Sequence, residues 1–122
     1  MKKILIVDDS NMSVRLFTAL LEGPSYQLKV ASDGAAALRA CAAERPDLVL
    51  LDLHLPEMDG FEVARRLKSD AHTRDIPILA VTAYGHGHAT DEALTAGVDR
   101  FMAKPFSGVA LREMVASLVL AA

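Results

Sequence analysis

The chain has 122 residues, of which 52% are hydrophobic and 24% are charged, and its formal net charge is −3. This length and composition are typical of one folded domain, so we expect residues 1–122 to share a single core. The negative charge gives no support for nucleic acid as the main partner. No stretch reaches the roughly 18 apolar residues of a membrane span, and the apolar run near the start is too short for a signal peptide. We therefore expect a cytoplasmic protein that contacts neither nucleic acid nor a membrane.

Five short segments are predicted to form β-strands. Three are apolar throughout, which is typical of parallel strands covered on both faces. These three strands are expected at residues 4–7, 48–51 and 78–81. Residues 27–30 alternate polar and apolar side chains, as an edge strand does, and residues 101–103 form a short strand that stops before a proline.

Helical segments are predicted between these strands. Ser10 is a candidate N-cap for the first helix, which carries Met12, Leu16 and Leu20 at four-residue spacing and ends before Gly23. The later helices are expected over residues 33–44, 59–67, 90–96 and 108–120.

Strand and helix thus alternate along the whole chain, and right-handed crossovers then place helices on both faces of a parallel sheet. We predict an α/β fold with a doubly wound, flavodoxin-like five-stranded sheet in the order 2-1-3-4-5. That order is a common solution for such sheets and does not follow from the spacing alone.

Polar residues follow four of the predicted strands. Asp8 and Asp9 come after the first strand, Asp52 after the third, Thr82 at the end of the fourth and Lys104 after the fifth. Ligands of open parallel sheets bind beyond the carboxyl ends of the strands, at the switch in strand order. We therefore expect these five side chains to converge at one edge of the sheet. A helix-cap or turn role would account for any one of the aspartates, but less well for the whole set.

Three neighbouring carboxylates repel one another, and a hard divalent cation such as Mg²⁺ relieves that repulsion. The first strand–helix turn contains no glycine, which argues against a phosphate cradle for a nucleotide. A carboxylate can instead attack phosphorus and form an acyl phosphate. Mg²⁺ and Lys104 would then offset charge on the phosphoryl oxygens, and Thr82 has a hydroxyl to donate.

Four motifs together resemble the receiver domain of bacterial two-component response regulators. They are residues 4–9, which end in the aspartate pair, residues 50–60 around Asp52, residues 81–83 and the pair 104–105. The resemblance covers nearly the whole chain, and the set is far more specific than any one motif.

This resemblance implies that Asp52 accepts a phosphoryl group from a histidine kinase or phosphotransfer protein. It also implies that Mg²⁺ is bound directly by Asp9, by Asp52 and by the backbone carbonyl of His54, with Asp8 acting through water. Under this reading the protein is a switch and not an enzyme, beyond its own phosphorylation and autodephosphorylation.

The resemblance further implies switch roles for residues after the fourth strand. Thr82 would move toward the phosphoryl group, Lys104 would pair with it in front of a cis proline peptide, and Phe101 would swing inward as Thr82 moves. A plain packing role for Phe101 remains an alternative. Tyr84 occupies a position that, like that of His54, tends to tune the lifetime of the phosphoryl group.

No output module is apparent after the last predicted helix, so we expect signalling by altered protein binding. A downstream protein would contact the predicted fourth helix, fifth strand and fifth helix, and homodimerisation on phosphorylation stays open. The chain is similar in length to stand-alone receivers of the DivK type. Two alternatives are a receiver cut from a hybrid kinase or multidomain regulator, and a Mg²⁺-dependent phosphohydrolase. Such hydrolases usually carry a second aspartate where this chain has Ser10.

Overall fold

The computed structural model describes residues 1–82 and 95–121 of the chain. Its five-stranded parallel sheet has the order β2-β1-β3-β4-β5, as the sequence predicts. The strands are β1 (Lys2–Val7), β2 (Tyr26–Ala31), β3 (Leu48–Leu51), β4 (Ile78–Thr82) and β5 (Arg100–Ala103). The chain order reverses between β1 and β3, so a crevice is expected above their carboxyl ends.

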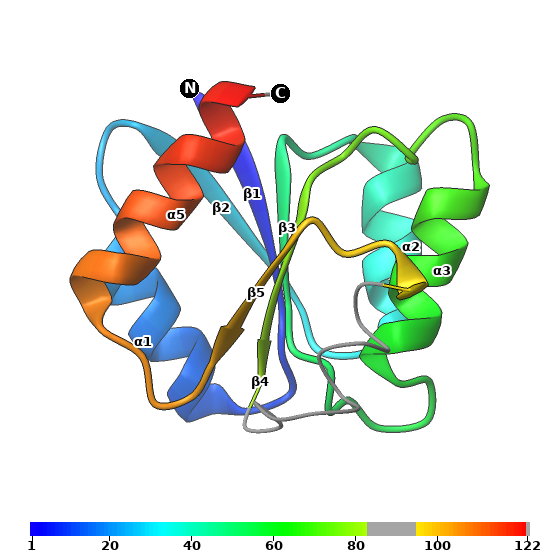
Figure 1. Cartoon of the computed structure of the whole chain (residues 1–122), viewed down its shortest axis with the longest axis horizontal. Helices are drawn as coiled ribbons and strands as arrows, with labels where there is room; N and C mark the ends of the chain where they lie inside the picture. Colours follow the sequence, from blue (N-terminus) through cyan, green and yellow to red (C-terminus); the bar gives the residue numbers. More distant parts are fainter. Residues whose placement is uncertain (83–94, 122) are drawn as a thin grey trace.

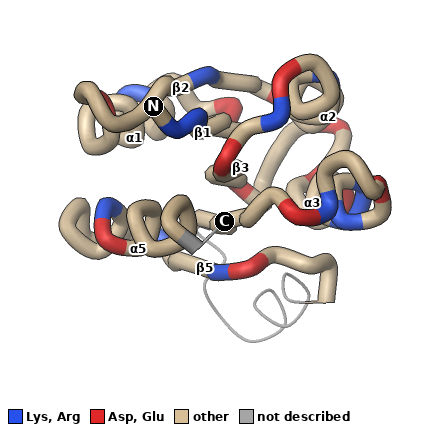
Figure 2. Tube along the Cα trace, turned by 90° about the horizontal axis from the view of Figure 1, so that it is seen from above, with Lys and Arg blue, Asp and Glu red and all other residues tan. Residues whose placement is uncertain are grey.

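Helices cover both faces of this sheet (Figures 1 and 2). The helices α1 (Asn11–Leu21) and α5 (Gly108–Ala121) lie on one face, and α2 (Gly34–Ala43) and α3 (Gly60–Ser69) lie on the other. The helix predicted over residues 90–96 falls largely outside the described residues. Within the described part of the chain, no helix has the length and apolar character needed to cross a bilayer.

Side-chain caps fix where three of the helices begin. The Ser13 amide donates to the Ser10 hydroxyl at 3.3 Å at the start of α1. Asp33 accepts from the third residue of α2 at 2.7 Å, and Asp59 accepts from the third residue of α3 at 2.9 Å. Each cap satisfies a backbone N–H that has no partner within its own helix. The predicted helix starts at Ser10, Asp33 and Asp59 are thereby confirmed.

Two apolar clusters fill the space between the sheet and its two helical layers, in agreement with the apolar strands of the sequence. The cluster under α2 and α3 includes Leu5, Val49, Val63 and Leu67. The cluster under α1 and α5 includes Ile4, Leu50, Phe17, Leu111 and Val115. Because successive strand residues point to opposite faces, each buried strand contributes to both clusters.

The four-residue spacing of Met12, Leu16 and Leu20 does not mark the buried face of α1. Met12 is 81% exposed and Leu16 is 48% exposed, whereas Phe17 and Leu21 are buried. Phe17 is the bulkiest apolar side chain of the helix, and burying it rotates the row that contains Met12 and Leu16 toward solvent.

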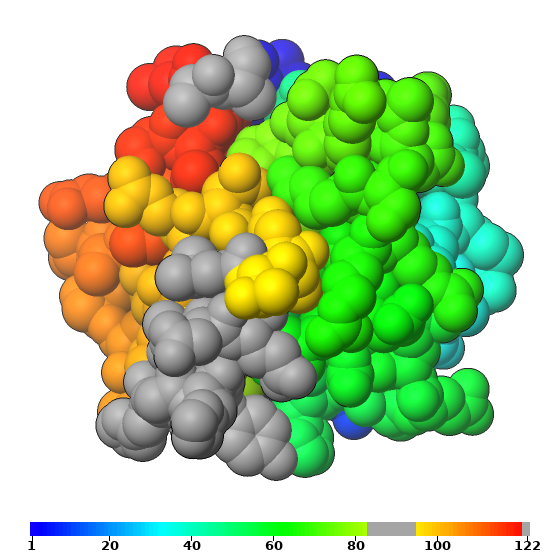
Figure 3. Space-filling model, turned by 45° about the vertical axis from the view of Figure 1, so that its right-hand side comes forward, coloured from blue at the N-terminus to red at the C-terminus, as the bar shows by residue number. Residues whose placement is uncertain are grey.

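Lys68 connects α3 to the segment that precedes β5. Its ammonium group donates to the Ile76 carbonyl at 2.9 Å and to the Asp99 carboxylate at 3.0 Å. Asp99 also accepts from the amide of Ile78, the first residue of β4, at 2.7 Å. Figure 3 shows this segment, in yellow, lying against the green surface of α3. These contacts hold the amino ends of β4 and β5 in place and so help to fix the register of their carboxyl ends.

Candidate functional site

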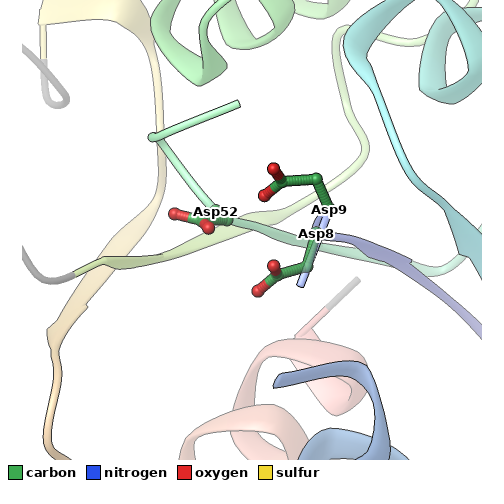
Figure 4. A group of neighbouring side chains, drawn as sticks. All are labelled: Asp8, Asp9 and Asp52. Atoms are coloured by element: carbon green, nitrogen blue, oxygen red, sulfur yellow. The ribbon is translucent and has the colours of Figure 1, made fainter. Parts of the chain in front are cut away.

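Three aspartates meet where β1 and β3 end. Asp8 and Asp9 directly follow β1, and Asp52 directly follows β3. One carboxylate oxygen from each residue lies within 4.8 Å of the other two, and we call this group the acidic cluster. Figure 4 shows the carboxylates of Asp8 and Asp9 directed to the side on which Asp52 lies. Asp8 is 1% exposed and Asp52 is 8% exposed, whereas Asp9 is exposed. The convergence predicted from the sequence is thereby confirmed for the three aspartates.

The sheet places two of these aspartates by extending its hydrogen bonding one residue past the strands. The Asp52 amide donates to the Val7 carbonyl at 2.9 Å, and the Asp8 amide donates to the Ala31 carbonyl at 3.1 Å. Backbone positions of Asp8 and Asp52 are therefore as fixed as those of the strands themselves.

Local backbone groups then orient the two carboxylates. Asp8 Oδ1 accepts from the Ser10 amide at 2.9 Å, and Asp52 Oδ1 accepts from the His54 amide at 3.0 Å. The second oxygen, Oδ2, of both residues faces the ammonium group of Lys104. Each buried carboxylate thus has one oxygen held by the backbone and one that faces the inside of the cluster.

The beginning of α3 packs directly against the backbone of the site. A Cβ atom at Gly60 would lie 2.5 Å from the Leu53 Cα and 2.6 Å from the Asp52 carbonyl oxygen, which is closer than real Cβ contacts. The Gly60 amide donates to the Leu53 carbonyl at 3.1 Å. Only glycine permits this approach, so Gly60 sets the position of the segment that follows Asp52.

Lys104 brings the one positive charge that the described residues place against the acidic cluster. Its Nζ atom lies 3.6 Å from Asp8 Oδ2 and 4.0 Å from Asp52 Oδ2. Its backbone amide donates to the Thr82 carbonyl at 2.9 Å, and the peptide bond to Pro105 is cis, as expected. Thr82, at the end of β4, is fully buried beside this bond.

The other residues named from the sequence lie nearby or outside the described part. His54 is exposed, and its backbone belongs to the loop after Asp52. Phe101 is partly buried and packs against the core under α2 and α3, which fits the packing alternative. Tyr84 lies outside the described residues.

Burial and like charge raise the pKa of Asp52 above its usual value. Burial is the largest cause, and the charges of Asp8 and Asp9 act in the same direction. The His54 amide and the Lys104 ammonium group oppose the shift but do not cancel it. The ionised form of Asp52 is therefore destabilised relative to a carboxylate in water.

The cluster has the features of a site for a hard divalent cation. Asp8 Oδ2 is buried and has no hydrogen-bond partner among the described residues, which is costly for a charged oxygen. Three carboxylates and one ammonium group carry a net charge of −2, since −3 + 1 = −2. Oxygen ligands and this charge suit Mg²⁺ or another hard cation, so the residues present fit such an ion.

Sequence reasoning missed two residues of this site. Gly60 lies at the start of the helix predicted over residues 59–67, but its contact with Asp52 is not predicted, because a close backbone approach has no local sequence signal. Ser13 was also missed, although its hydroxyl accepts a hydrogen bond from Lys104 Nζ at 3.3 Å. Its place in the first turn of α1, beside the edge where the acids meet, is the signal that could have found it.

Comparison with known proteins agrees with this geometry. Residues 4–116 match the family model of the response regulator receiver domain. The chain is 41% identical over 116 residues to the response regulator PleD of Caulobacter vibrioides, covering 95% of this chain and 26% of PleD. It is 36% identical over 106 residues to the polar-differentiation response regulator DivK of Brucella anthropi, covering 87% of this chain and 86% of DivK. The chain thus spans about a quarter of PleD but most of DivK.

One solved structure of similar shape contains a metal ion. The receiver domain of a sensor histidine kinase from Pseudomonas aeruginosa superimposes with a TM-score of 0.89 at 29% identity. The match covers 97% of both chains, and in that structure a magnesium ion is coordinated in the active-site cleft.

Proposed function

This chain belongs to the response regulator receiver domain family, and on that premise we propose that Asp52 accepts a phosphoryl group in a Mg²⁺-dependent reaction. The observation that carries the proposal is the convergence of three aspartates and Lys104 at the carboxyl edge of the sheet. Asp8 and Asp52 each have a backbone-held oxygen and a second oxygen facing the lysine, but Asp52 is the more exposed of the two, at 8% against 1%, and so the more accessible to a phosphoryl donor.

In the proposed reaction, Asp52 Oδ2 attacks the phosphorus atom of a phosphohistidine in line with the bond to the imidazole nitrogen. The new O–P bond forms an acyl phosphate, the P–N bond breaks, and its electron pair leaves with the imidazole. The His54 amide holds Oδ1 and so directs Oδ2 toward the incoming group. Together with Lys104, that amide favours the ionised carboxylate that the attack requires.

Mg²⁺ would be held by the acidic cluster and by the backbone carbonyl of His54, with Asp8 acting through water, and would supply positive charge beside the phosphoryl oxygens. Lys104 provides a second positive charge, since its ammonium group already faces both buried carboxylates.

The remaining residues propagate the change in this proposal. The Thr82 hydroxyl donates to the acyl phosphate, and Phe101 changes its packing against the core when Thr82 moves. His54 and Tyr84 influence how long the acyl phosphate lasts. These roles start from the hydrogen bond in which the Lys104 amide donates to the Thr82 carbonyl, where β5 and β4 end.

Receiver domains interact with histidine kinases and with downstream proteins. For this chain we propose that residues 1–122 act as one receiver that takes its phosphoryl group from a histidine kinase or phosphotransfer protein in the cytoplasm. A downstream protein then binds the face made by the predicted fourth helix, most of which lies outside the described residues, together with β5 and α5. The chain is a switch under this proposal, and it turns over no substrate other than its own acyl phosphate.

Acetyl phosphate supplies the test, because it donates a phosphoryl group without a kinase. Incubation with acetyl phosphate and Mg²⁺ should add one phosphoryl group per chain, and excess EDTA or the Asp52→Asn variant should prevent it. Intact-mass spectrometry measures the addition. Asp75→Asn is the matched control, since Asp75 is an exposed aspartate before β4, at the opposite edge of the sheet.

Two results would count against the proposal. Modification of Asp52→Asn to the same extent as the parent would place the acceptor elsewhere. Repeated release of phosphate from a small phosphomonoester would instead identify a phosphohydrolase.

A further inference from the structure

The ammonium group of Lys104 is held short of the carboxylates it faces. Its distances to Asp8 Oδ2 and Asp52 Oδ2, 3.6 Å and 4.0 Å, exceed those of a charge-assisted hydrogen bond, about 2.7–2.9 Å. Among the described residues, the contact of this ammonium group within hydrogen-bonding distance is to the Ser13 hydroxyl, which accepts from Nζ at 3.3 Å. A neutral oxygen on α1 therefore binds an ammonium group that two buried carboxylates attract.

The first turn of α1 gives Ser13 a fixed position. The Ser13 amide donates to the Ser10 hydroxyl, and the Ser10 amide donates to Asp8 Oδ1. Four residues further along the same helix, the Phe17 ring stacks on Phe106, with centroids 5.6 Å apart and planes 6° apart. α1 thus contacts the segment 104–106 at two points, and one of them is the lysine of the site.

Lys104 and a divalent cation compete for the same atoms. The Oδ1 atoms of Asp8 and Asp52 already accept from backbone amides, so the Oδ2 atoms are the ones that face the inside of the cluster. An ammonium group bound tightly to these Oδ2 atoms would occupy them and repel a second cation.

We propose that Ser13 is a positioning residue whose hydroxyl holds Lys104 off the acidic cluster and so keeps its oxygens open to the cation. In the absence of this hydroxyl, Coulomb attraction draws the ammonium group onto the carboxylates. With the hydroxyl present, the ammonium group stays off the Oδ2 atoms both before and after the cation binds. The cation then has no ammonium group to displace, which favours its binding. This inference rests on the proposed function, because it concerns the same Mg²⁺ site.

The test is the dissociation constant for Mg²⁺, measured by isothermal titration calorimetry at constant pH and ionic strength. Ser13→Ala should raise this constant about threefold or more, since the 3.3 Å contact is a hydrogen bond of ordinary net strength. Ser13→Thr keeps a hydroxyl at the same position and should restore affinity close to that of the parent.

A second background separates positioning of Lys104 from a general effect on α1. Lys104→Met removes the competing charge and should itself tighten Mg²⁺ binding. In that background Ser13→Ala should have no further effect, because no ammonium group remains to be positioned. A loss of affinity that persists in the Lys104→Met background would overturn the inference.

The parent and the Asp52→Asn variant distinguish this inference from the proposed function. Mg²⁺ binding that the parent shows and the Asp52→Asn variant has lost supports the proposed site. Equal constants for the parent and Ser13→Ala would then refute the role of Ser13 alone. A parent that binds no Mg²⁺ would overturn the proposed function and this inference together.

Discussion

Both ends of the sheet carry clustered charges, yet the two clusters differ in balance and in exposure. Near the amino end of β1, Glu44 lies 3.6 Å from Lys3 and 3.2 Å from Lys29, and all three side chains are at least 39% exposed. At the carboxyl end, three acids face one lysine, and Asp8 and Asp52 are almost completely buried. The charges of the first cluster are paired and exposed to solvent, whereas those of the second are unbalanced and largely buried.

The pKa shifts of the two clusters run in opposite directions. A hydrogen bond from Lys29, followed by the charges of Lys29 and Lys3, lowers the pKa of Glu44. Burial raises the pKa of Asp52, although a lysine lies near that residue as well. A neighbouring lysine therefore does not decide the state of a carboxylate. Burial and an excess of like charge decide it, and they distinguish a binding site from an ordinary surface ion pair.

The largest expected effect comes from filling the close approach at Gly60. Gly60→Ala forces its Cβ against the backbone of Leu53 and Asp52, neither of which can rotate away, so the free energy of unfolding should fall by about 2–3 kcal/mol. Urea unfolding with an unchanged m-value measures this loss.

Gly108→Ala is the matched control, because Gly108 also begins a helix. Its Cβ would meet only the tip of the flexible Leu20 side chain, at 2.8 Å, and the loss should stay below about 1 kcal/mol. Equal losses in the two variants would mean that the carboxyl edge is no more tightly constrained than the rest of the chain.

The sequence predicted most of the fold because its strongest signals are local and repeated. Apolar strands, cap residues and the strand–helix alternation all act over a few residues, and the sheet order follows a common topology. The five polar residues at the strand ends were also predictable, since parallel strands bring their carboxyl ends to one edge.

The rest depended on packing between distant segments. The rotation of α1 that buries Phe17 and exposes Met12 is set by the sheet and α5, not by spacing within the helix. The contact between Ser13 and Lys104 joins residues 91 positions apart, and the sequence shows only that Ser13 lies in the first turn of a helix near the acids, not which residue it contacts. Tyr84 and most of the predicted fourth helix lie outside the described residues, so those expectations stay predictions.

The second largest effect is expected from the Asp52→Asn substitution, and this change in stability depends on pH. Burial and like charge raise the folded pKa of Asp52, so its ionisation favours the unfolded chain. Its favourable contribution is complete below the unfolded pKa, near 3.8, and is lost as pH rises through the folded pKa. In EDTA, Asp52→Asn should therefore be more stable than the parent at pH 7, by on the order of 1 kcal/mol, with a smaller gain near pH 4.

Thermal or urea unfolding at both pH values measures this difference. Asp75→Asn, which changes an exposed aspartate, should show no comparable gain at either pH. A parent that is more stable than Asp52→Asn at pH 7 without divalent cations would contradict the inference that burial and like charge destabilise the ionised Asp52 carboxylate.

The smallest effect is expected at the paired cluster. Since the folded pKa of Glu44 is lowered, its contribution to stability is present above the unfolded pKa, near 4.5, and is lost as pH falls through the folded pKa. Water and salt screen these exposed charges, so Glu44→Gln should lower the Tm by no more than about 2 °C at low salt and by less at high salt.

The matched control is Glu113→Gln, which changes an exposed glutamate on α5. The affinity for Mg²⁺ should not change in either variant. A weakened Mg²⁺ site in Glu44→Gln would mean that the two ends of the sheet are coupled, and the contrast between a paired surface cluster and a strained site would no longer hold.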